Sequence, residues 1–254
     1  MRGRLKFDKD RKMKKDSLLV CIAFHYVPER VKYLNFILCA LVEEYLPNEK
    51  VAPLHIIIDT NTKDIEWFYE NHRQITVCVH ENLEHPFHLT WKHRQHIKDN
   101  IDNYETFMYV EDDMYVPYEN YLNYLQNFKM WWPQYVPSFI RVEEKNNEKF
   151  VADINEKQPL NIISNSGRQF TFLPFLQNYH AFWIMPAKEL KETMKEDFVR
   201  LTDGREFAAM YVGWELGLQT LIEIEDNKVS KKCYSYHLPN NAPNVNLKVE
   251  DIFL

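Results

Sequence analysis

The sequence predicts an α/β protein built on a mainly parallel sheet. In the first half of the 254-residue chain, apolar runs with strand composition alternate four times with amphipathic, helix-like stretches. This alternation is typical of parallel strands joined by right-handed crossovers. Because the chain is 45% hydrophobic, one large domain can bury a substantial core, so we expect a single domain over residues 17–254.

The first half of the chain supplies the parallel strands. Pro28 opens the first helix and Pro47 closes it, Thr90 is expected to cap the third, and Pro117 pre-sets the first turn of the fourth. The expected strands are residues 18–25, 54–59, 75–80 and 106–110, and the expected helices are residues 29–45, 60–70, 90–101 and 118–131.

The second half is less regular. A charged turn at residues 143–149 separates two short runs that favour antiparallel strands, and the polar stretch around Gly167 favours a loop. The expected elements are strands 138–142, 150–153 and 179–185, a loop at 158–169, helices 186–200 and 213–225, and an extended end at 233–254.

The ends, charge and cysteines limit the class of protein. Residues 1–16 are basic with few apolar side chains, so we expect a disordered tail, and the apolar run that follows is too short for a signal peptide or anchor. We therefore expect no transmembrane segment. Four scattered cysteines without C-x-x-C spacing indicate free thiols in a reducing, cytoplasmic compartment. The net charge of −6 argues against a nucleic-acid partner.

Three consecutive carboxylates, Glu111, Asp112 and Asp113, end the fourth expected strand. Carboxylates this close raise one another's pKa unless a cation neutralises them, and a hard divalent ion is the usual solution. A solvated turn is the alternative, but both flanks of the acids are apolar. They stand at a strand-to-helix corner, where open α/β sheets place ligands.

Glycine-based phosphate sites are absent from the sequence. Only five glycines occur and none lies in the first strand-to-helix turns, so both G-x-G-x-x-G and the Walker A loop are missing, as is a G-x-S-x-G elbow. A bound nucleoside diphosphate would need another neutralising group, such as a divalent ion held by Asp113 and its neighbours.

With these motifs, the sequence from about residue 18 to residue 237 resembles the nucleotide-sugar glycosyltransferases of the GT-A fold, and looks closest to small virus-like or microbial ones. In that family a D-x-D-type motif after the fourth strand binds Mn²⁺ or Mg²⁺ and, through it, the donor diphosphate. Here the motif stands as E-D-D, so either Glu111 with Asp113 or the pair Asp112–Asp113 would take this role. The resemblance implies a three-layer α/β/α sandwich with a mixed, mainly parallel sheet.

The resemblance also implies an activity and roles for single residues. The protein would move a sugar from a nucleoside-diphosphate donor to an acceptor hydroxyl of a glycan. Inversion through Glu215 is the expected course, and retention, which would not require Glu215, is the alternative. His25 and Tyr26 would line the nucleobase pocket, and Asp59 would meet the base or ribose. The general base would be Glu215 and the late metal ligand His237.

Further candidates come from side-chain chemistry. Arg94 belongs to a basic helix surface that could face the diphosphate. Sugar rings stack on indole, so tryptophans are candidates for acceptor contact, with core packing as the default. Of Trp131, Trp132, Trp183 and Trp214, the resemblance favours Trp183 and Trp214, because they lie in the segments that the family uses for this contact.

Several alternatives remain open at this point. Glu215 could be an ordinary acid at a helix N-terminus, Asp59 a helix cap, and His237 a surface histidine. Five histidines lie between residues 80 and 96, but zinc is not expected because H-E-x-x-H is absent and no cysteine is near enough. The rival functions are a metal-dependent nucleotidyltransferase or phosphohydrolase, and a transferase-like domain that only binds a glycan or partner.

Overall fold

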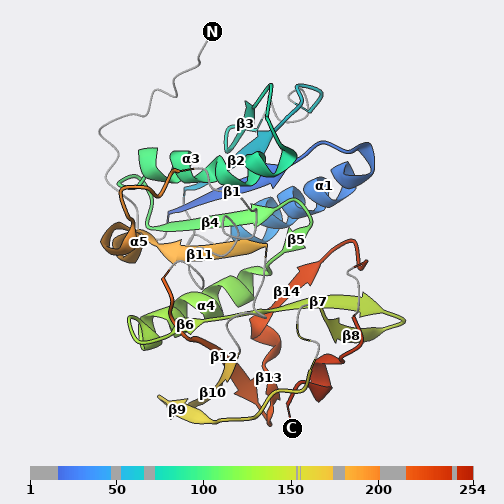
Figure 1. The fold of residues 1–254 in the computed structure, drawn as a ribbon, viewed down its shortest axis with the longest axis vertical. Coiled ribbons are helices and arrows are strands. Elements are labelled where there is room, and N and C mark those ends of the chain that lie inside the picture. Colours follow the sequence, from blue (N-terminus) through green and yellow to red (C-terminus); the bar gives the residue numbers. More distant parts are fainter. Residues whose placement is uncertain are drawn as a thin grey trace.

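The computed structural model describes residues 17–46, 53–65, 72–152, 154, 156–173, 181–200, 216–241 and 245–253. It shows a mixed α/β protein in which each of the three sheets contains both parallel and antiparallel strand pairs (Figure 1). The predicted α/β class is therefore confirmed.

The upper sheet in Figure 1 has five strands in the order β11-β4-β1-β2-β3. The neighbours from β4 to β3 are parallel, and β11 runs antiparallel to β4. Near-continuous apolar runs form the central strands, as expected for strands covered on both faces. The bounds are β1 Leu18–Phe24, β2 Leu54–Thr60, β3 Ile75–Val79, β4 Thr106–Glu111 and β11 Phe182–Pro186.

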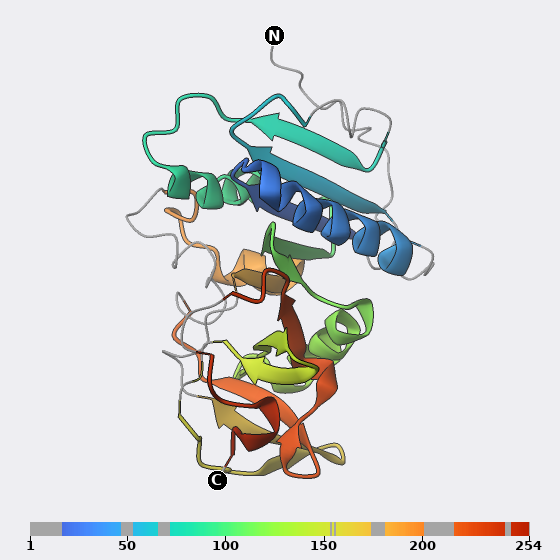
Figure 2. The same cartoon turned by 90° about the vertical axis from the view of Figure 1, so that its right-hand side faces the viewer.

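Two helices cover opposite faces of this sheet. Helix α1 (Val31–Ala40) shares a small cavity with Met108 and Val110 of β4. Helix α3 (His93–Asp99) stacks His93 on Tyr109, with ring centroids 4.0 Å apart. Because successive strand residues point to opposite faces, the two helices lie on different sides (Figures 1 and 2). The short helices beside them are η1 Pro28–Arg30, η2 Leu41–Tyr45 and η3 Pro86–Trp91.

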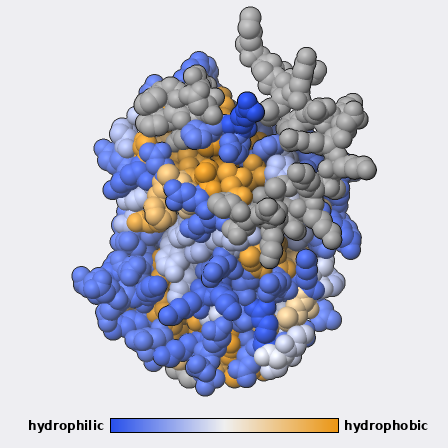
Figure 3. Space-filling view, turned by 180° about the vertical axis from the view of Figure 1, so that it is seen from behind, coloured by the Kyte–Doolittle hydropathy of each residue, from blue (hydrophilic) through white to orange (hydrophobic). Residues whose placement is uncertain are grey.

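Helix α4 (Tyr118–Trp131) runs between the upper sheet and two smaller sheets (Figure 1). The largest core cluster joins the upper sheet, α1 and α4, whereas the lower sheets have smaller clusters. On the face seen in Figure 3, hydrophobic surface gathers in the upper part, and most of the lower part is hydrophilic. The acidic corner therefore belongs to the half that holds the largest core cluster.

The lower sheets are built from short strands. One has the order β13-β12-β10-β9 with β6 beside β12, and the other the order β5-β14-β7-β8. The strand bounds are β5 Met114–Tyr115, β6 Val136–Pro137, β7 Ile140–Lys145, β8 Glu148–Val151, β9 Ile163–Asn165, β10 Arg168–Leu173, β12 Thr220–Glu225, β13 Lys228–Val229 and β14 Tyr234–His237. The remaining helices are α5 Ala187–Thr193, η6 Lys231–Cys233 and η7 Val249–Asp251.

Several predicted elements are confirmed. Helix α4 has the predicted bounds, and the four parallel strands agree to within two residues at each end. The hairpin β7–β8 also forms, around a turn in which Asn146 and Asn147 have positive φ. Asparagine tolerates this left-handed region better than most residues, which explains how the charged segment reverses.

Two predicted elements in the second half are wrong. The helix expected at 213–225 is a strand over Thr220–Glu225, because T-L-I-E-I-E alternates with period 2 and pairs with β10. The loop expected at 158–169 contains the hairpin β9–β10, whose turn residues Ser166 and Gly167 both have positive φ.

Two predictions about the middle helices also need correction. Thr90 does not cap α3, since its Oγ1 donates to the carbonyl oxygen of Phe87 inside η3, which begins after His85. The helix expected at 60–70 is not present over residues 60–65, and the rest of that range lies outside the described residues.

Candidate functional site at the carboxyl edge of the upper sheet

The acidic residues stand where β4 leaves the upper sheet. Glu111 is in register with Ala23 of β1 and donates its backbone N–H to the Ala181 carbonyl at 3.0 Å. The N–H of Asp112 bonds to the Ala23 carbonyl at 3.2 Å. Asp112 and Asp113 are only 3% and 7% exposed. Neighbouring strands thus fix the backbone of two buried carboxylates.

Arg30 supplies the counter-charge of this buried pair. It lies on η1, just after β1, and donates two parallel hydrogen bonds to Asp112, from Nε to Oδ2 at 2.8 Å and from Nη2 to Oδ1 at 2.7 Å. The same Nη2 lies 2.8 Å from Asp113 Oδ2. The Arg30 side chain is 35% exposed, so the site opens to solvent on this side.

His237 approaches the acids from the other half of the molecule. It pairs with Met114 where β14 meets β5, and the neighbouring Leu238 N–H bonds to the Asp113 carbonyl at 2.9 Å. Its Nε2 lies 3.5 Å from Asp113 Oδ2, and its Nδ1 lies 2.5 Å from Oε1 of Glu143, which is fully buried on β7. The sequence predicted that His237 belongs to this site, and the structure places it there.

The electrostatics of the four groups are coupled. Burial raises the pKa of Asp112, aided by the charge of Asp113 and opposed by Arg30. Burial also favours the protonated form of Asp113, but hydrogen bonding to His237 and the charge of Arg30 outweigh it, so the pKa of Asp113 is lowered. Burial opposes a charged His237, yet its bonds to Asp113 and Glu143 raise its pKa. The site therefore stabilises positive charge beside Asp113.

The residues expected to meet a nucleobase lie at the same edge. His25 and Tyr26 follow β1 and are half-buried. The Tyr26 N–H donates to Asn61 Oδ1 at 2.8 Å, and Asn61 Nδ2 lies 3.4 Å from His25 Nε2. Asn61 follows β2, so this amide ties the ends of two parallel strands together beside the acids.

Asp59 does not cap a helix, because its carboxylate is held by two histidines. It is 1% exposed, and its Oδ1 accepts hydrogen bonds from His80 Nε2 at 2.6 Å and His96 Nε2 at 2.9 Å. The bonds to these histidines outweigh the burial of Asp59 and lower its pKa. The side chains of these two histidines are 23% exposed, whereas that of Asp59 is 1% exposed.

Two other candidates belong to the interior. Arg94 is 2% exposed, donates from Nη1 to the Phe198 carbonyl at 3.1 Å, and lies over the Trp91 ring. Trp183 on β11 is 4% exposed and packs edge-to-face on His93. These placements correct the predictions of a diphosphate contact for Arg94 and a sugar-stacking surface for Trp183.

Glu215 and Trp214 lie outside the described residues. Sequence reasoning also missed Arg30 and Glu143, the partners of the acids and of His237. A signal existed for Arg30, because it follows the first strand in a segment that the α/β pattern brings to the same sheet edge. Glu143 gave no such signal, since it lies in a charged stretch that resembles an exposed turn.

Within the described residues, no helix is both long and apolar enough to cross a membrane. In comparisons with known proteins, no family model matches the chain, and the search of curated proteins finds no match.

Proposed function

We propose that the protein is a metal-dependent glycosyltransferase that transfers a sugar from a nucleoside-diphosphate donor to an acceptor hydroxyl of a glycan. The observation that carries this proposal is the buried pair Asp112–Asp113 at the carboxyl edge of a parallel sheet, with His237 directed at Asp113. The placement of α1 and α3 on opposite faces of the sheet supports a three-layer, GT-A-like arrangement.

The donor set at this corner fits Mn²⁺ or Mg²⁺. Arg30 Nη2 is already within 2.8 Å of one oxygen from each aspartate, so a positive centre can be held between them. Asp112, Asp113 and His237 would hold the ion there. The bond from His237 Nδ1 to Glu143 leaves Nε2 facing Asp113, which is the arrangement that orients metal-binding histidines. When bound, such an ion would neutralise the charge that grows on the departing diphosphate.

Arg30 has a second part in this proposal. The guanidinium and a metal ion would compete for the same carboxylate oxygens, so ion binding would release Arg30. A guanidinium on a half-exposed turn is well suited to bind phosphate oxygens in pairs. Arg30 would then hold the donor diphosphate, while His25, Tyr26 and Asn61 would line the nucleobase pocket.

Glu215 remains the proposed base that deprotonates the acceptor hydroxyl, and Trp214 the proposed acceptor contact, on the resemblance alone. For Glu215→Gln we expect intact donor binding and lost transfer, and unchanged turnover would remove it as the base.

The test of the metal assignment is Asp113→Asn. We expect the variant to lose Mn²⁺-dependent binding of nucleoside diphosphates and at least about 100-fold of its transfer or donor-hydrolysis rate, because the ion loses its central ligand. Glu119→Gln is the matched control, since Glu119 is an exposed acid six residues further along the chain. Undiminished turnover in the Asp113 variant would contradict the metal site.

A panel of nucleotide sugars, read for both sugar transfer and release of sugar 1-phosphate, separates the transferase from its rivals. A transferase breaks the bond between the sugar and the diphosphate and releases a nucleoside diphosphate, whereas a nucleotidyltransferase or phosphohydrolase would break the bond between the two phosphates and release sugar 1-phosphate. A domain that only binds glycans or a partner would show no metal-dependent affinity for nucleotides.

A further inference from the structure

A second group of metal-ligand side chains lies at the same sheet edge, apart from the acidic corner. Asp59 is near the end of β2, His80 directly follows β3, and His96 is on α3. The Asp59 oxygen and one nitrogen from each histidine all lie within 4.8 Å of one another. Three separate segments of the chain therefore converge on one point.

The geometry is close to that of a coordinated ion. Ligand atoms about 2.1 Å from a tetrahedral Zn²⁺ are about 3.4 Å apart. His80 Nε2 and His96 Nε2 stand 2.6 and 2.9 Å from Asp59 Oδ1, so each contact needs to open by less than about 1 Å. Side-chain rotations of that size leave the strands and the helix in place.

The surroundings also favour a built site. Asp59 is 1% exposed on a strand that is hydrogen-bonded on both sides, so its carboxylate is held firmly. The backbone of His80 is fixed by a bond of 2.8 Å to the Thr60 carbonyl, and Asn100 Nδ2 bonds to the His96 carbonyl at 2.8 Å. Because the histidine side chains are 23% exposed, an ion can enter from solvent.

We propose that Asp59, His80 and His96 bind a divalent transition-metal ion, with Zn²⁺ as the best match. Two imidazoles and one carboxylate suit zinc and related ions better than Mg²⁺, which prefers oxygen ligands. The ion would join β2, β3 and α3 at the edge where the proposed donor site lies.

This site is separate from the acidic corner. Ala23 of β1 is in register with Asp59 on one side and with Glu111 on the other. Adjacent strands are about 4.8 Å apart, so the two sites are about 10 Å apart across the sheet. The new site does not depend on the proposed activity, and its metal preference differs from that of the acidic corner.

The test is a titration of the metal-stripped, full-length protein with Zn²⁺ and with Co²⁺, in the Asp113→Asn background to remove the other site. We expect one tight site, and His80→Gln and His96→Gln should each weaken it by about 100-fold or more because each removes a ligand. His72→Gln is the control, since it is an exposed histidine at the opposite end of β3. Binding that is absent, or equal in all the variants, would overturn the proposal.

A second measurement avoids the risk that the variants fold poorly. In the unsubstituted protein, paramagnetic Co²⁺ should broaden the imidazole NMR signals of His80 and His96 and leave those of His72 sharp. Broadening of the three histidines to the same degree would mean non-specific binding and would contradict the site. Neither readout requires enzymatic activity, so failure of the proposed function leaves this test valid.

Discussion

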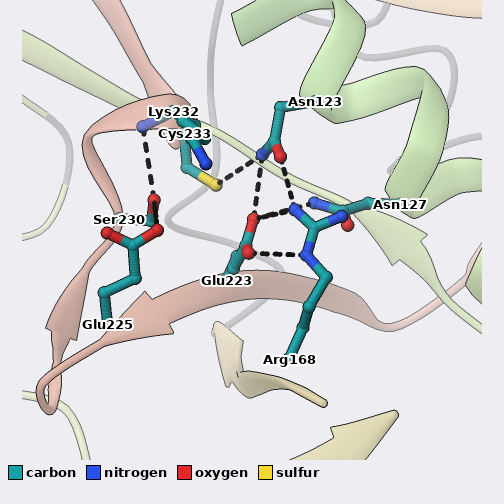
Figure 4. A network of polar contacts seen from close by, with 8 residues as sticks. All are labelled: Asn123, Asn127, Arg168, Glu223, Glu225, Ser230, Lys232 and Cys233. Carbon is teal, nitrogen blue, oxygen red and sulfur yellow. Dashed lines mark hydrogen bonds and ion pairs between the residues drawn. The ribbon is translucent and has the colours of Figure 1, made fainter. Parts of the chain in front are cut away.

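Two groups in the described part of the chain pair an arginine with buried carboxylates, and they differ in the number of carboxylates that the arginine binds. At the upper sheet, one guanidinium from Arg30 is shared between Asp112 and Asp113. In the lower half, Arg168 of β10 binds the single carboxylate of Glu223 on β12, with Nε 2.7 Å from Oε1 and Nη2 on Oε2 (Figure 4).

In the lower group, two neutral side-chain amides also donate hydrogen bonds to the carboxylate. Asn123 and Asn127 of α4 donate from Nδ2 to Glu223 Oε2 at 3.0 and 3.3 Å, and Asn123 Oδ1 accepts from Arg168 (Figure 4). Its positive and negative charges match one to one. At the upper sheet, one arginine is shared between two carboxylates, and one of these also lies 3.5 Å from a histidine nitrogen. The lower group therefore joins α4 to its sheet, whereas the upper group is the place where we propose that a metal ion exchanges with Arg30.

Removal of Arg168 is expected to have the largest effect on stability. In Arg168→Met, Glu223 would stay buried without its counter-ion, and breaking such a pair costs about 3 kcal/mol of unfolding free energy. Urea unfolding followed by circular dichroism measures it. Addition of Mn²⁺ should not restore the loss, because one carboxylate surrounded by amides offers too few ligands. A change below about 0.5 kcal/mol would contradict a joining role.

Removal of Arg30 should have a smaller effect that metal reverses. Arg30→Met leaves Asp112 and Asp113 without their guanidinium, but Arg30 is partly exposed, so we expect a loss of about 1 to 2 kcal/mol in the presence of chelator. Mn²⁺ or Mg²⁺ should restore the stability and bind more tightly than to the unsubstituted protein, because the competing cation is gone. Equal metal affinity in the two proteins would show that Arg30 and the ion do not share the site.

The same contrast explains what the sequence could predict. Residues 106–131 carry strong local signals, an apolar strand, three acids, a proline and an amphipathic helix, and the structure follows them closely. The sequence also predicts where the acids lie, because parallel strands bring their carboxyl ends to one edge of the sheet. Local pattern and tertiary packing agree over this stretch.

Partners from distant segments could not be predicted. The sequence predicts a loop at Arg168 and a helix at Glu223, because their strands are defined only by pairing with each other. Likewise, Asp59 is joined to His80 and His96 by the fold and not by any fixed spacing in the sequence. Side-chain chemistry is visible in one sequence, but convergence across two strands and a helix is a property of the tertiary structure.

The lower group should also give a pH-dependent contribution to stability. Burial favours the neutral form of Glu223, but its bonds to Arg168 and Asn123 outweigh this, so its pKa is lowered in the folded protein. The stabilisation is therefore present above the ordinary glutamate value of about 4.3 and is lost as the pH falls through the folded value. Glu223→Gln should cost about 1 kcal/mol at pH 7 and progressively less below pH of about 4. A difference that stays constant with pH would contradict the role of the ionised carboxylate.

The smallest effect is expected at Asn127, the amide that lies further from the Glu223 carboxylate. Its contact with Glu223 Oε2 is the longer of the two amide bonds, at 3.3 Å, so Asn127→Ala should cost only about 0.5 kcal/mol. Asn123→Ala should cost more, because it also removes the acceptor of Arg168. A double-mutant cycle with Glu223→Gln measures the coupling, and Gln126→Ala on the same helix is the exposed control. If the amides stabilise the ionised carboxylate of Glu223, the coupling energy between Asn127 and Glu223 is positive, and that between Gln126 and Glu223 is close to zero. Equal values would mean that the Asn127 amide does not stabilise the ionised carboxylate of Glu223.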